Sequence, residues 1–231
     1  PEVQTEIVAI DPTPAERRLA DAARKHLRDL YDQLFRAVSP SLTPEEEESL
    51  IAARSQLNGG VRTARMAASD PFTVASSEGV IAMLLQQAGL IEPALLNGGT
   101  KRKHIATLVD DLVENEEAVL VFTEFSSAAE NLINDLEELG VAVGGFMGSM
   151  TQKARTKSQE RFMDGALDCL VLTTAGQKGL NLERATTVIN YELPWVPSEL
   201  VQRVGRAARI GSTAQHLNVL CPVMAGTIEE K

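Results

Sequence analysis

The spacing of apolar residues divides the chain into a first part with helical periodicity and a second part in which short apolar runs alternate with amphipathic stretches. Val3 to Ile10 alternates apolar with polar residues, which predicts a strand. Thr13 can cap a helix that begins with Pro14. The helical pattern then continues to about residue 96, and four breaks are expected in it, at Ser39-Pro40, Asn58-Gly59-Gly60, Asp70-Pro71 and Glu92-Pro93. We therefore predict a first strand and linker over 1–13 and a helical insertion over 14–97.

A second helix start is predicted at Thr43, where Pro44 precedes four consecutive glutamates, Glu45 to Glu48. Acidic side chains near a helix N-terminus interact favourably with the helix dipole. Runs of charge on a helix are usually solvated, so this run is interpreted as an exposed helix face rather than as a binding site.

After Gly98-Gly99 the pattern changes to that of strands separated by helices. Five β-rich runs are predicted as strands: Ala118–Thr123, Val141–Phe146, Asp168–Thr173, Thr187–Tyr191 and His216–Leu220. Amphipathic stretches near 126–139, 151–164 and 196–210 lie between them. Strands that are apolar along their whole length are buried on both faces, as in a parallel sheet with helices on each side. The fold predicted over 98–231 is therefore an α/β domain with such a sheet.

Composition excludes some classes of protein without choosing among the rest. Of the 231 residues, 44% are hydrophobic and 23% are charged, which is typical of a globular protein rather than a disordered or fibrous one. The net charge of −10 argues against a protein that coats polyanions over its whole surface, although a local basic cluster can still bind nucleic acid. Cys169 and Cys221 lie in apolar, strand-like runs and are predicted to be reduced core residues, with no metal site.

The expected location is the cytoplasm, with no membrane partner, because no apolar run approaches 18 residues and no secretory leader opens the chain. Abundant alanine and an excess of arginine over lysine favour a bacterial or viral origin.

The sharpest local signal is the segment Gln202-Arg203-Val204-Gly205-Arg206-Ala207-Ala208-Arg209-Ile210-Gly211. At about 100° per residue, Gln202, Arg206 and Arg209 share one helical stripe, and the stripe of Val201, Val204 and Ala208 is predicted to face the sheet. Two arginines that project together suit phosphate oxygens. Taken alone, the same pattern also fits a surface helix whose arginines pair with nearby carboxylates.

A second segment strengthens the phosphate interpretation. The strand that ends at Thr173 is followed by Ala175-Gly176-Gln177-Lys178-Gly179, and glycines after a strand allow the backbone to approach phosphates closely. This is not a Walker loop, because neither Gly-Lys-Ser nor Gly-Lys-Thr occurs in the sequence.

The order of these segments resembles the second RecA-like domain of superfamily-two helicases, and most closely that of Swi/Snf-type DNA translocases. Five blocks carry the resemblance: Val119 to Phe125; Gly148, Arg155 and Phe162 at intervals of seven; Thr173 to Leu182; Val188 to Glu192 with Trp195 and Pro197; and Gln202 to Gly211. More loosely, residues 14–96 resemble the helical protrusion of the family, and Lys103 stands where a lysine precedes the helix that leads into the first block.

The resemblance implies an ATP-dependent double-stranded DNA translocase in which ATP and Mg²⁺ bind in a cleft between two RecA-like domains. The first domain, on another part of the same polypeptide, would hold the Mg²⁺ and most of the nucleotide. This chain would supply Arg206 and Arg209 as arginine fingers and Gln202 to orient them or the attacking water. Gly179 and Asn181 would contact the nucleotide. A fragment with this domain alone is expected not to hydrolyse ATP.

For the DNA partner the resemblance and the local charge indicate six residues: Thr123, Arg155, Thr173, Lys153, Lys157 and Lys178. Lys153, Lys157 and Arg161 are spaced four apart, so they form one basic stripe, which can also be an ordinary solvated helix face. Trp195, the one tryptophan, can stack on a base, although packing of its loop is the preferred interpretation.

Departures from the family pattern leave two other functions open. Gln177 replaces a glycine, and Ala208 replaces the histidine between the two arginines, so a histidine hydrogen-bond relay cannot link the nucleotide to DNA. These changes also fit a non-catalytic module that binds nucleic acid or a partner on a degenerate motor fold. An RNA helicase or a restriction-type translocase of the same superfamily is the remaining alternative.

Overall fold

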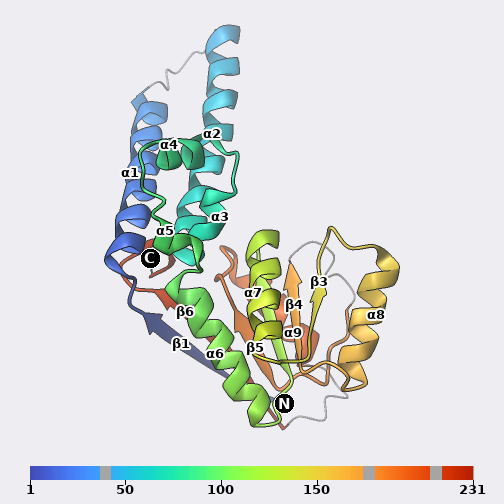
Figure 1. Cartoon of the computed structure of the whole chain (residues 1–231). Coiled ribbons are helices and arrows are strands. Elements are labelled where there is room, and N and C mark those ends of the chain that lie inside the picture. The colour runs from blue at the N-terminus through green and yellow to red at the C-terminus, as the bar shows by residue number, and fades with distance from the viewer. Residues whose placement is uncertain (37–42, 174–179, 209–214, 231) are drawn as a thin grey trace. The chain divides into compact units, whose positions relative to one another are not determined.

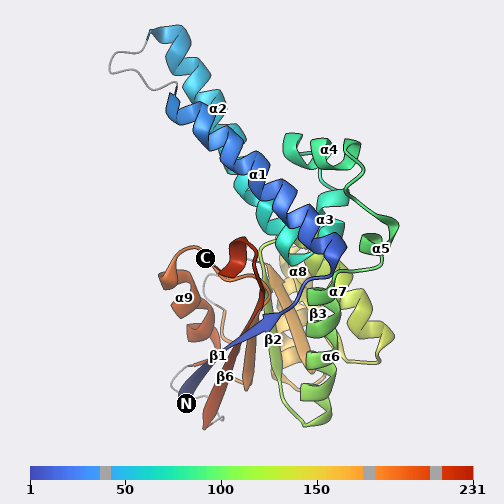
Figure 2. The same cartoon turned by 90° about the vertical axis from the view of Figure 1, so that its left-hand side faces the viewer.

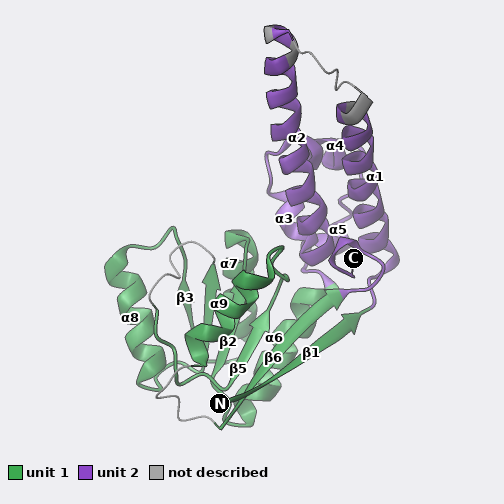
Figure 3. Cartoon of the chain, turned by 180° about the vertical axis from the view of Figure 1, so that it is seen from behind, with its two compact units in different colours: residues 1–10, 100–223 green, residues 11–99, 224–231 purple. Residues whose placement is uncertain are grey.

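The computed structural model describes residues 1–36, 43–173, 180–208 and 215–230 (Figure 1). The chain forms two compact units (Figure 3). The α/β unit comprises Pro1–Ile10 and Thr100–Val223, and the helical unit comprises Asp11–Gly99 and the residues from Met224 onward. The end of the chain thus packs with the helical unit, whereas the prediction placed all of 98–231 in one domain.

The α/β unit is built on a six-stranded sheet with the order β1-β6-β5-β2-β4-β3. The strands are β1 (Glu2–Ile10), β2 (Val119–Thr123), β3 (Val143–Phe146), β4 (Cys169–Thr173), β5 (Thr187–Asn190) and β6 (His216–Met224). The pairs β3/β4, β4/β2, β2/β5 and β5/β6 are parallel, and the arrows of β1 and β6 point the same way in Figure 3. The predicted parallel sheet is confirmed.

Helices cover both faces of this sheet, as predicted for strands that are apolar throughout. They are α6 (Thr100–Glu114), α7 (Ser126–Glu138), α8 (Gln152–Met163) and α9 (Pro197–Ala207). Seen from the side in Figure 2, α9 lies on one side of the sheet and α6 and α7 lie on the other. The guanidinium Nε of Arg102 in α6 donates to Oδ2 of Asp135 in α7 at 2.8 Å and so ties these two helices together.

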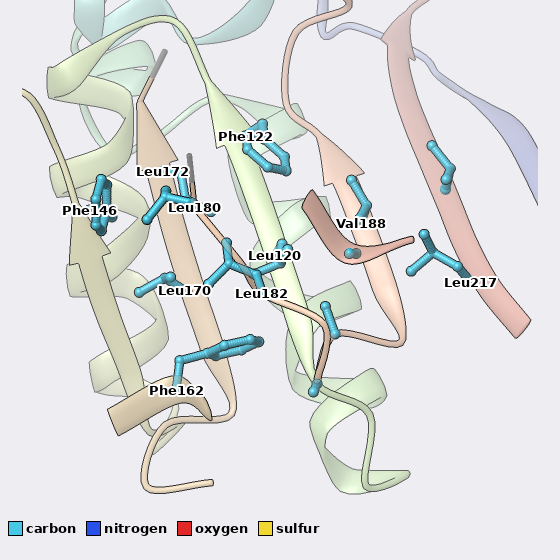
Figure 4. Packing of buried hydrophobic residues seen from close by; sticks show 14 of the residues in the cluster. Leu120, Phe122, Phe146, Phe162, Leu170, Leu172, Leu180, Leu182, Val188 and Leu217 are labelled. Carbon is cyan, nitrogen blue, oxygen red and sulfur yellow. The ribbon is translucent and has the colours of Figure 1, made fainter. Parts of the chain in front are cut away.

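Alternate residues of the strands build the core on the α9 face. Leu120, Phe122, Leu170 and Leu172 form one cluster, which is completed by Phe162 of α8 and by Ala207 of α9 (Figure 4). The intervening residues, such as Val121 and Val171, are also fully buried. They point to the opposite face because strand side chains alternate, and α7 packs against β2, β3 and β4.

The helical unit contains α1 (Pro14–Arg36), α2 (Pro44–Ser69), α3 (Pro71–Ala75), α4 (Val80–Gln87), α5 (Pro93–Leu96) and a short 3₁₀ turn, η1 (Ile228–Glu230). The predicted start of α1 is confirmed with its cap. The Glu16 amide donates to Thr13 Oγ1 at 3.3 Å, and the Thr13 amide donates back to the Glu16 carboxylate at 2.7 Å. This is a capping box, which satisfies two amides that the helix itself leaves unpaired. The acidic run at the start of α2 is solvated as expected, since Glu45, Glu47 and Glu48 are exposed.

Two of the predicted helix breaks are confirmed, one is wrong, and one lies outside the described residues. Helices begin at Pro71 and at Pro93, but α2 continues without a break through Asn58-Gly59-Gly60. Packing explains the exception, because a side chain on Gly60 would place its Cβ 2.9 Å from Ile81 Cδ1 and 3.2 Å from Leu27 Cδ1. Gly60 therefore allows the neighbouring helices to approach closely, and these contacts outweigh its low helix propensity. The Ser39-Pro40 break falls on residues that are not described.

Cys169 in β4 and Cys221 in β6 are both buried and free, as predicted. Within the described ranges, no helix is both long enough and apolar enough to span a membrane.

Candidate nucleotide and nucleic-acid site

Parallel strands of the α/β unit end at a common sheet edge, where ligands of open α/β folds usually bind. Thr123 of β2 is in register with Thr173 of β4, and Phe122 is in register with Asn190, the last residue of β5. The sequence-predicted residues Thr123 and Thr173 therefore lie next to each other at this edge.

Both threonine side chains are buried and hydrogen-bonded within the unit. The Thr123 hydroxyl donates to the Glu192 carboxylate at 3.3 Å and accepts from the Phe125 amide at 3.2 Å. The Thr173 hydroxyl accepts from the Gly148 amide at 3.3 Å. Thr123 has no exposed surface, so a phosphate can reach its hydroxyl only if the Glu192 contact opens. DNA contact by either threonine stays a prediction.

The orientation of α9 differs in part from the prediction. Gln202 is exposed and Arg206 is half-buried, but Val201, which was expected to face the sheet, is 70% exposed. The residue that is buried instead is Arg203, at 2% exposure, together with Ala207. Val204 and Ala208 pack at the margin of the core cluster, as expected. The helix is rotated from the predicted orientation because the interior at this point offers hydrogen-bond acceptors to a guanidinium.

Arg206 and Asn181 carry the two features that best fit a polar ligand. The Leu182 amide donates to the Arg206 carbonyl at 3.0 Å, which places Asn181 beside the last turn of α9. Arg206 Nε and Asn181 Oδ1 are both buried, and neither has a hydrogen-bond partner among the residues that the structure describes. A buried polar atom without a partner costs free energy unless a ligand or water satisfies it. These two atoms belong to residues that the sequence assigns to nucleotide binding, and that assignment stays a prediction.

Three predicted residues fall on segments that the structure does not describe: Lys178, Gly179 and Arg209. Their predicted contacts with DNA, the nucleotide and the transferred phosphate stay predictions.

The basic side chains of α8 divide into exposed and packed groups. Lys153, Lys157 and Arg161 are exposed, so their charges are accessible to a polyanion. Arg155 is half-buried, with Cζ 5.8 Å from the centre of the Phe146 ring and Nη2 3.0 Å from Gln152 Oε1. Its Nε is buried and has no hydrogen-bond partner in the described ranges of the chain. Arg155 is thus held at the end of β3 with one donor unused.

Trp195 is 59% exposed and precedes α9. Val196 and Val201 nearby are also exposed, so this end of α9 presents apolar surface.

Sequence reasoning missed the buried polar residues behind this edge. Arg203 bonds to Asn190 and to the Glu192 carbonyl. Lys101 has no exposed surface and lies 5.6 Å above the Tyr191 ring, whereas Lys103, the predicted lysine, is exposed. Spacing alone did not single out Arg203, because at about 100° per residue it lies closer to Arg206 than to Val204 and is therefore assigned to the polar side.

A separate hollow of about 410 Å³ lies in the helical unit, between α1, α2 and α4. It is lined mainly by Leu30, Val80, Ile81, Leu84 and the bare backbone of Gly59, and it shares no residue with the sequence-predicted site. In the described parts of the chain, no group of three acidic, histidine or cysteine side chains is arranged to hold a metal ion.

Comparison with known proteins finds similarity to helicases in the second half of the chain. Residues 100–211, slightly less than half of the chain, match the family model described as Helicase conserved C-terminal domain. The ATP-dependent RNA helicase DBP3 of Gibberella zeae is 32% identical over 118 residues, which are 51% of this chain and 19% of that protein. The DEAD-box ATP-dependent RNA helicase CshA of Bacillus subtilis is 31% identical over 123 residues, 53% of this chain and 25% of the relative. The chain therefore spans about a fifth to a quarter of the length of these relatives.

Two solved structures share the fold over essentially the whole chain. The C-terminal part of the Fun30 ATPase domain covers 100% of this chain and 87% of its own, at 19% identity and a TM-score of 0.72. The Sulfolobus solfataricus SWI2/SNF2 ATPase C-terminal domain covers 99% of this chain and 82% of its own, at 16% identity and a TM-score of 0.62.

The fold is thus the RecA-like α/β fold of a helicase C-terminal domain, with a helical unit inserted after its first strand. Within that fold, residues 100–211 are the part of the chain that is similar to the helicase conserved C-terminal domain.

Proposed function

We propose that this chain is the C-terminal motor half of an ATP-dependent double-stranded DNA translocase of the Swi/Snf type. The observation that carries the proposal is the helical unit between β1 and α6, within a fold shared over 99% of the chain with a SWI2/SNF2 ATPase C-terminal domain. The block that ends in Trp195-Val196-Pro197 supports the same branch of the superfamily.

In this proposal ATP and Mg²⁺ bind mainly to a first RecA-like domain of the same polypeptide. The α/β unit of the present chain closes over the phosphates from the other side. The first domain would hold the Mg²⁺, which would supply neutralisation of the phosphate charge. The described residues fit a role opposite the nucleotide rather than a metal site, because Arg206 and Asn181 offer an unpaired donor and acceptor while no metal-ligand cluster is found among them. Arg206, with Arg209 and Gln202, would stabilise negative charge on the transferred phosphate.

Arginine fingers of this kind change turnover by about 10³- to 10⁵-fold. In the full-length protein we expect Arg206→Ala to lower DNA-stimulated kcat by at least about 10³-fold, because transition-state charge loses its partner. Arg18→Ala is the matched control, since Arg18 is an exposed arginine of the helical unit that pairs with Glu92. We expect it to stay within about twofold of wild type. Retention of stimulated turnover in Arg206→Ala would contradict the arginine-finger role.

An RNA helicase is the second candidate, and the matches to RNA helicases at 31–32% identity favour it. The two candidates differ in the polymer that stimulates ATP hydrolysis. Turnover of the full-length protein should be measured with double-stranded DNA, single-stranded DNA and RNA at one salt concentration. Strongest stimulation by the duplex DNA supports the translocase, and strongest stimulation by RNA supports the helicase.

A further inference from the structure

A buried polar network connects α9 to the ends of β5 and β2. Arg203 projects from α9 into the unit, where Nη1 donates to Asn190 Oδ1 and to the Glu192 carbonyl, both at 2.9 Å. Its Cζ lies 5.7 Å from the centre of the Phe122 ring, close enough for a cation–π contact. One guanidinium therefore holds α9 against both strands at their carboxyl ends.

Glu192 continues the network from β5 to β2. Its carboxylate has no exposed surface. Oε2 accepts the Glu124 amide at 2.9 Å, and Oε1 accepts the Thr123 hydroxyl at 3.3 Å. The Thr123 hydroxyl in turn accepts the amide of Phe125, which is the N-cap residue of α7. The contacts thus run without a gap from α9 to the start of α7.

Because the network is buried, removal of one of its members is expected to destabilise the fold. Arg203, Glu192, Asn190 and Lys101 are each at most 2% exposed, and a buried charge that loses its partner is strongly destabilising. The charges also act on a neighbour. Burial raises the pKa of the Cys221 thiol, and the Asn190 hydrogen bond, Lys101 and Arg203 lower it in part.

The network ends near Arg206 on one side and at the sheet edge near Thr123 on the other. In the proposed function, binding at that edge has to affect Arg206. Arg206 follows Arg203 by three residues, which is about one helical turn, so a shift of the Arg203 anchor changes where Arg206 projects. Thr123 lies at the sheet edge where the nucleic acid is predicted to bind. Ala208 stands where a histidine would relay this signal, and alanine has no side-chain hydrogen bond to offer.

We propose that Arg203 is a positioning residue for Arg206, and that the Arg203–Glu192–Thr123 network couples nucleic-acid binding at the sheet edge to the position of Arg206. The coupling role rests on the proposed function. The mechanical link itself concerns this chain alone and can be tested without nucleotide.

The first test measures the link by amide hydrogen exchange in the chain without ligands. Arg203→Lys keeps the charge but loses the guanidinium, whose Nη1 donates to both acceptors and whose Cζ lies near the Phe122 ring. We expect the Glu124 and Phe125 amides to exchange at least about tenfold faster in this variant. The Gly148 amide, which donates to Thr173 outside the network, is the internal control and should not change. Unchanged exchange at Glu124 and Phe125 would overturn the proposal.

The second test measures coupling in the full-length protein, as the ratio of ATP turnover with saturating nucleic acid to turnover without it. We expect Glu192→Gln and Arg203→Lys to lower this ratio at least about fivefold, with KM for ATP within about twofold of wild type. Glu192→Gln changes no side-chain volume, so it keeps the test valid if Arg203→Lys fails to fold.

Thr187→Val is the matched control for the second test, because Thr187 is also fully buried but lies at the opposite end of β5 and bonds to Glu117. It should change the ratio less than twofold. An unchanged ratio in the network variants would overturn the coupling, even if basal and stimulated turnover both fell by the same factor. If Arg206→Ala has no effect, the proposed function fails instead, and the exchange test still decides the mechanical link.

Discussion

Burial sets the chemistry of the two thiols at the residue scale. Cys169, the first residue of β4, is completely buried, and this burial, with a smaller effect of the Asp168 charge, raises the pKa of its thiol far above the ordinary value. Burial likewise raises the pKa of Cys221. Both residues therefore remain neutral thiols in the folded chain at any physiological pH, and they behave as small apolar core residues.

The raised pKa values predict that stability falls at alkaline pH. The unfolded chain loses the thiol protons near pH 8.5 while the folded chain keeps them. Above that pH the unfolded state binds fewer protons, so the free energy of unfolding falls by up to about 1.4 kcal/mol per pH unit for each thiol. Below pH 8.5 the stabilisation from the buried, protonated thiols is fully present. Urea unfolding between pH 7 and pH 10 measures this slope.

Cys169→Ala is the variant that isolates the effect. It should be less stable than wild type at pH 7, where it loses only packing, and its free energy of unfolding should fall less steeply above pH 8.5. Identical slopes for the two proteins would show that Cys169 does not contribute to the alkaline loss.

Individual residues also show what could be predicted from the sequence at this scale. Arg206 and Gln202 could be assigned to the polar side of α9 from spacing alone, and the structure leaves both partly accessible. Arg203 could not be placed, because its burial depends on acceptors from Asn190 and Glu192, which are 13 and 11 residues away along the chain. Periodicity assigns an arginine to solvent and contains no information on such partners.

At the scale of the element, local signals located most boundaries to within two residues. The strand predicted over Ala118–Thr123 is Val119–Thr123, and the helix predicted near 126–139 is Ser126–Glu138. These boundaries depend on side chains next to each other in sequence, such as the capping box at Thr13. The continuity of α2 through Gly59 and Gly60 was missed because it depends on tertiary contacts of Gly60 with Leu27 and Ile81.

The two glycines of α2 give a matched pair of variants. A Cβ on Gly59 would meet no described atom within 4 Å apart from its own stretch of α2, whereas one on Gly60 would lie 2.9 Å from Ile81 Cδ1. Gly59→Ala should raise the free energy of unfolding by about 1 kcal/mol, which is the difference in helix propensity. Gly60→Ala gains the same propensity but overpacks the interface, at a cost of about 1–3 kcal/mol.

Thermal unfolding of the two variants tests this explanation of α2. Gly59→Ala should melt about 2–4 °C above wild type, and Gly60→Ala should melt below Gly59→Ala. Equal melting temperatures would mean that close packing does not explain the glycine at position 60.

At the scale of the whole molecule, acidic residues are in excess, so the location of the basic side chains decides whether the chain can bind a polyanion. The net charge is −10, so nonspecific attraction to a polyanion is weak, and any binding must come from local basic clusters. The exposed stripe of α8 is such a cluster in the described α/β unit. The order of the blocks indicated the resemblance to helicases from sequence, and the spacing of the stripe predicted an exposed basic face. The structure confirms that exposure, with Phe162 packed into the core on the other side of α8.

Salt dependence of nucleic-acid binding tests whether this stripe contacts phosphates. Each phosphate that a protein neutralises in duplex DNA contributes about 0.9 to the slope of log K against log salt concentration. Lys153→Ala combined with Lys157→Ala in the full-length protein should weaken duplex binding and reduce the magnitude of the slope by about 1.8, because two counterion-releasing contacts are lost.

The control is Lys25→Ala combined with Lys103→Ala, which removes the same charge from exposed positions outside the stripe. If both double variants reduced affinity equally and left the slope unchanged, the effect would be one of net charge, and α8 would be an ordinary solvated helix. A slope that changes only in the α8 variant would instead place phosphates on α8, beside the edge where Arg155 and Thr173 lie.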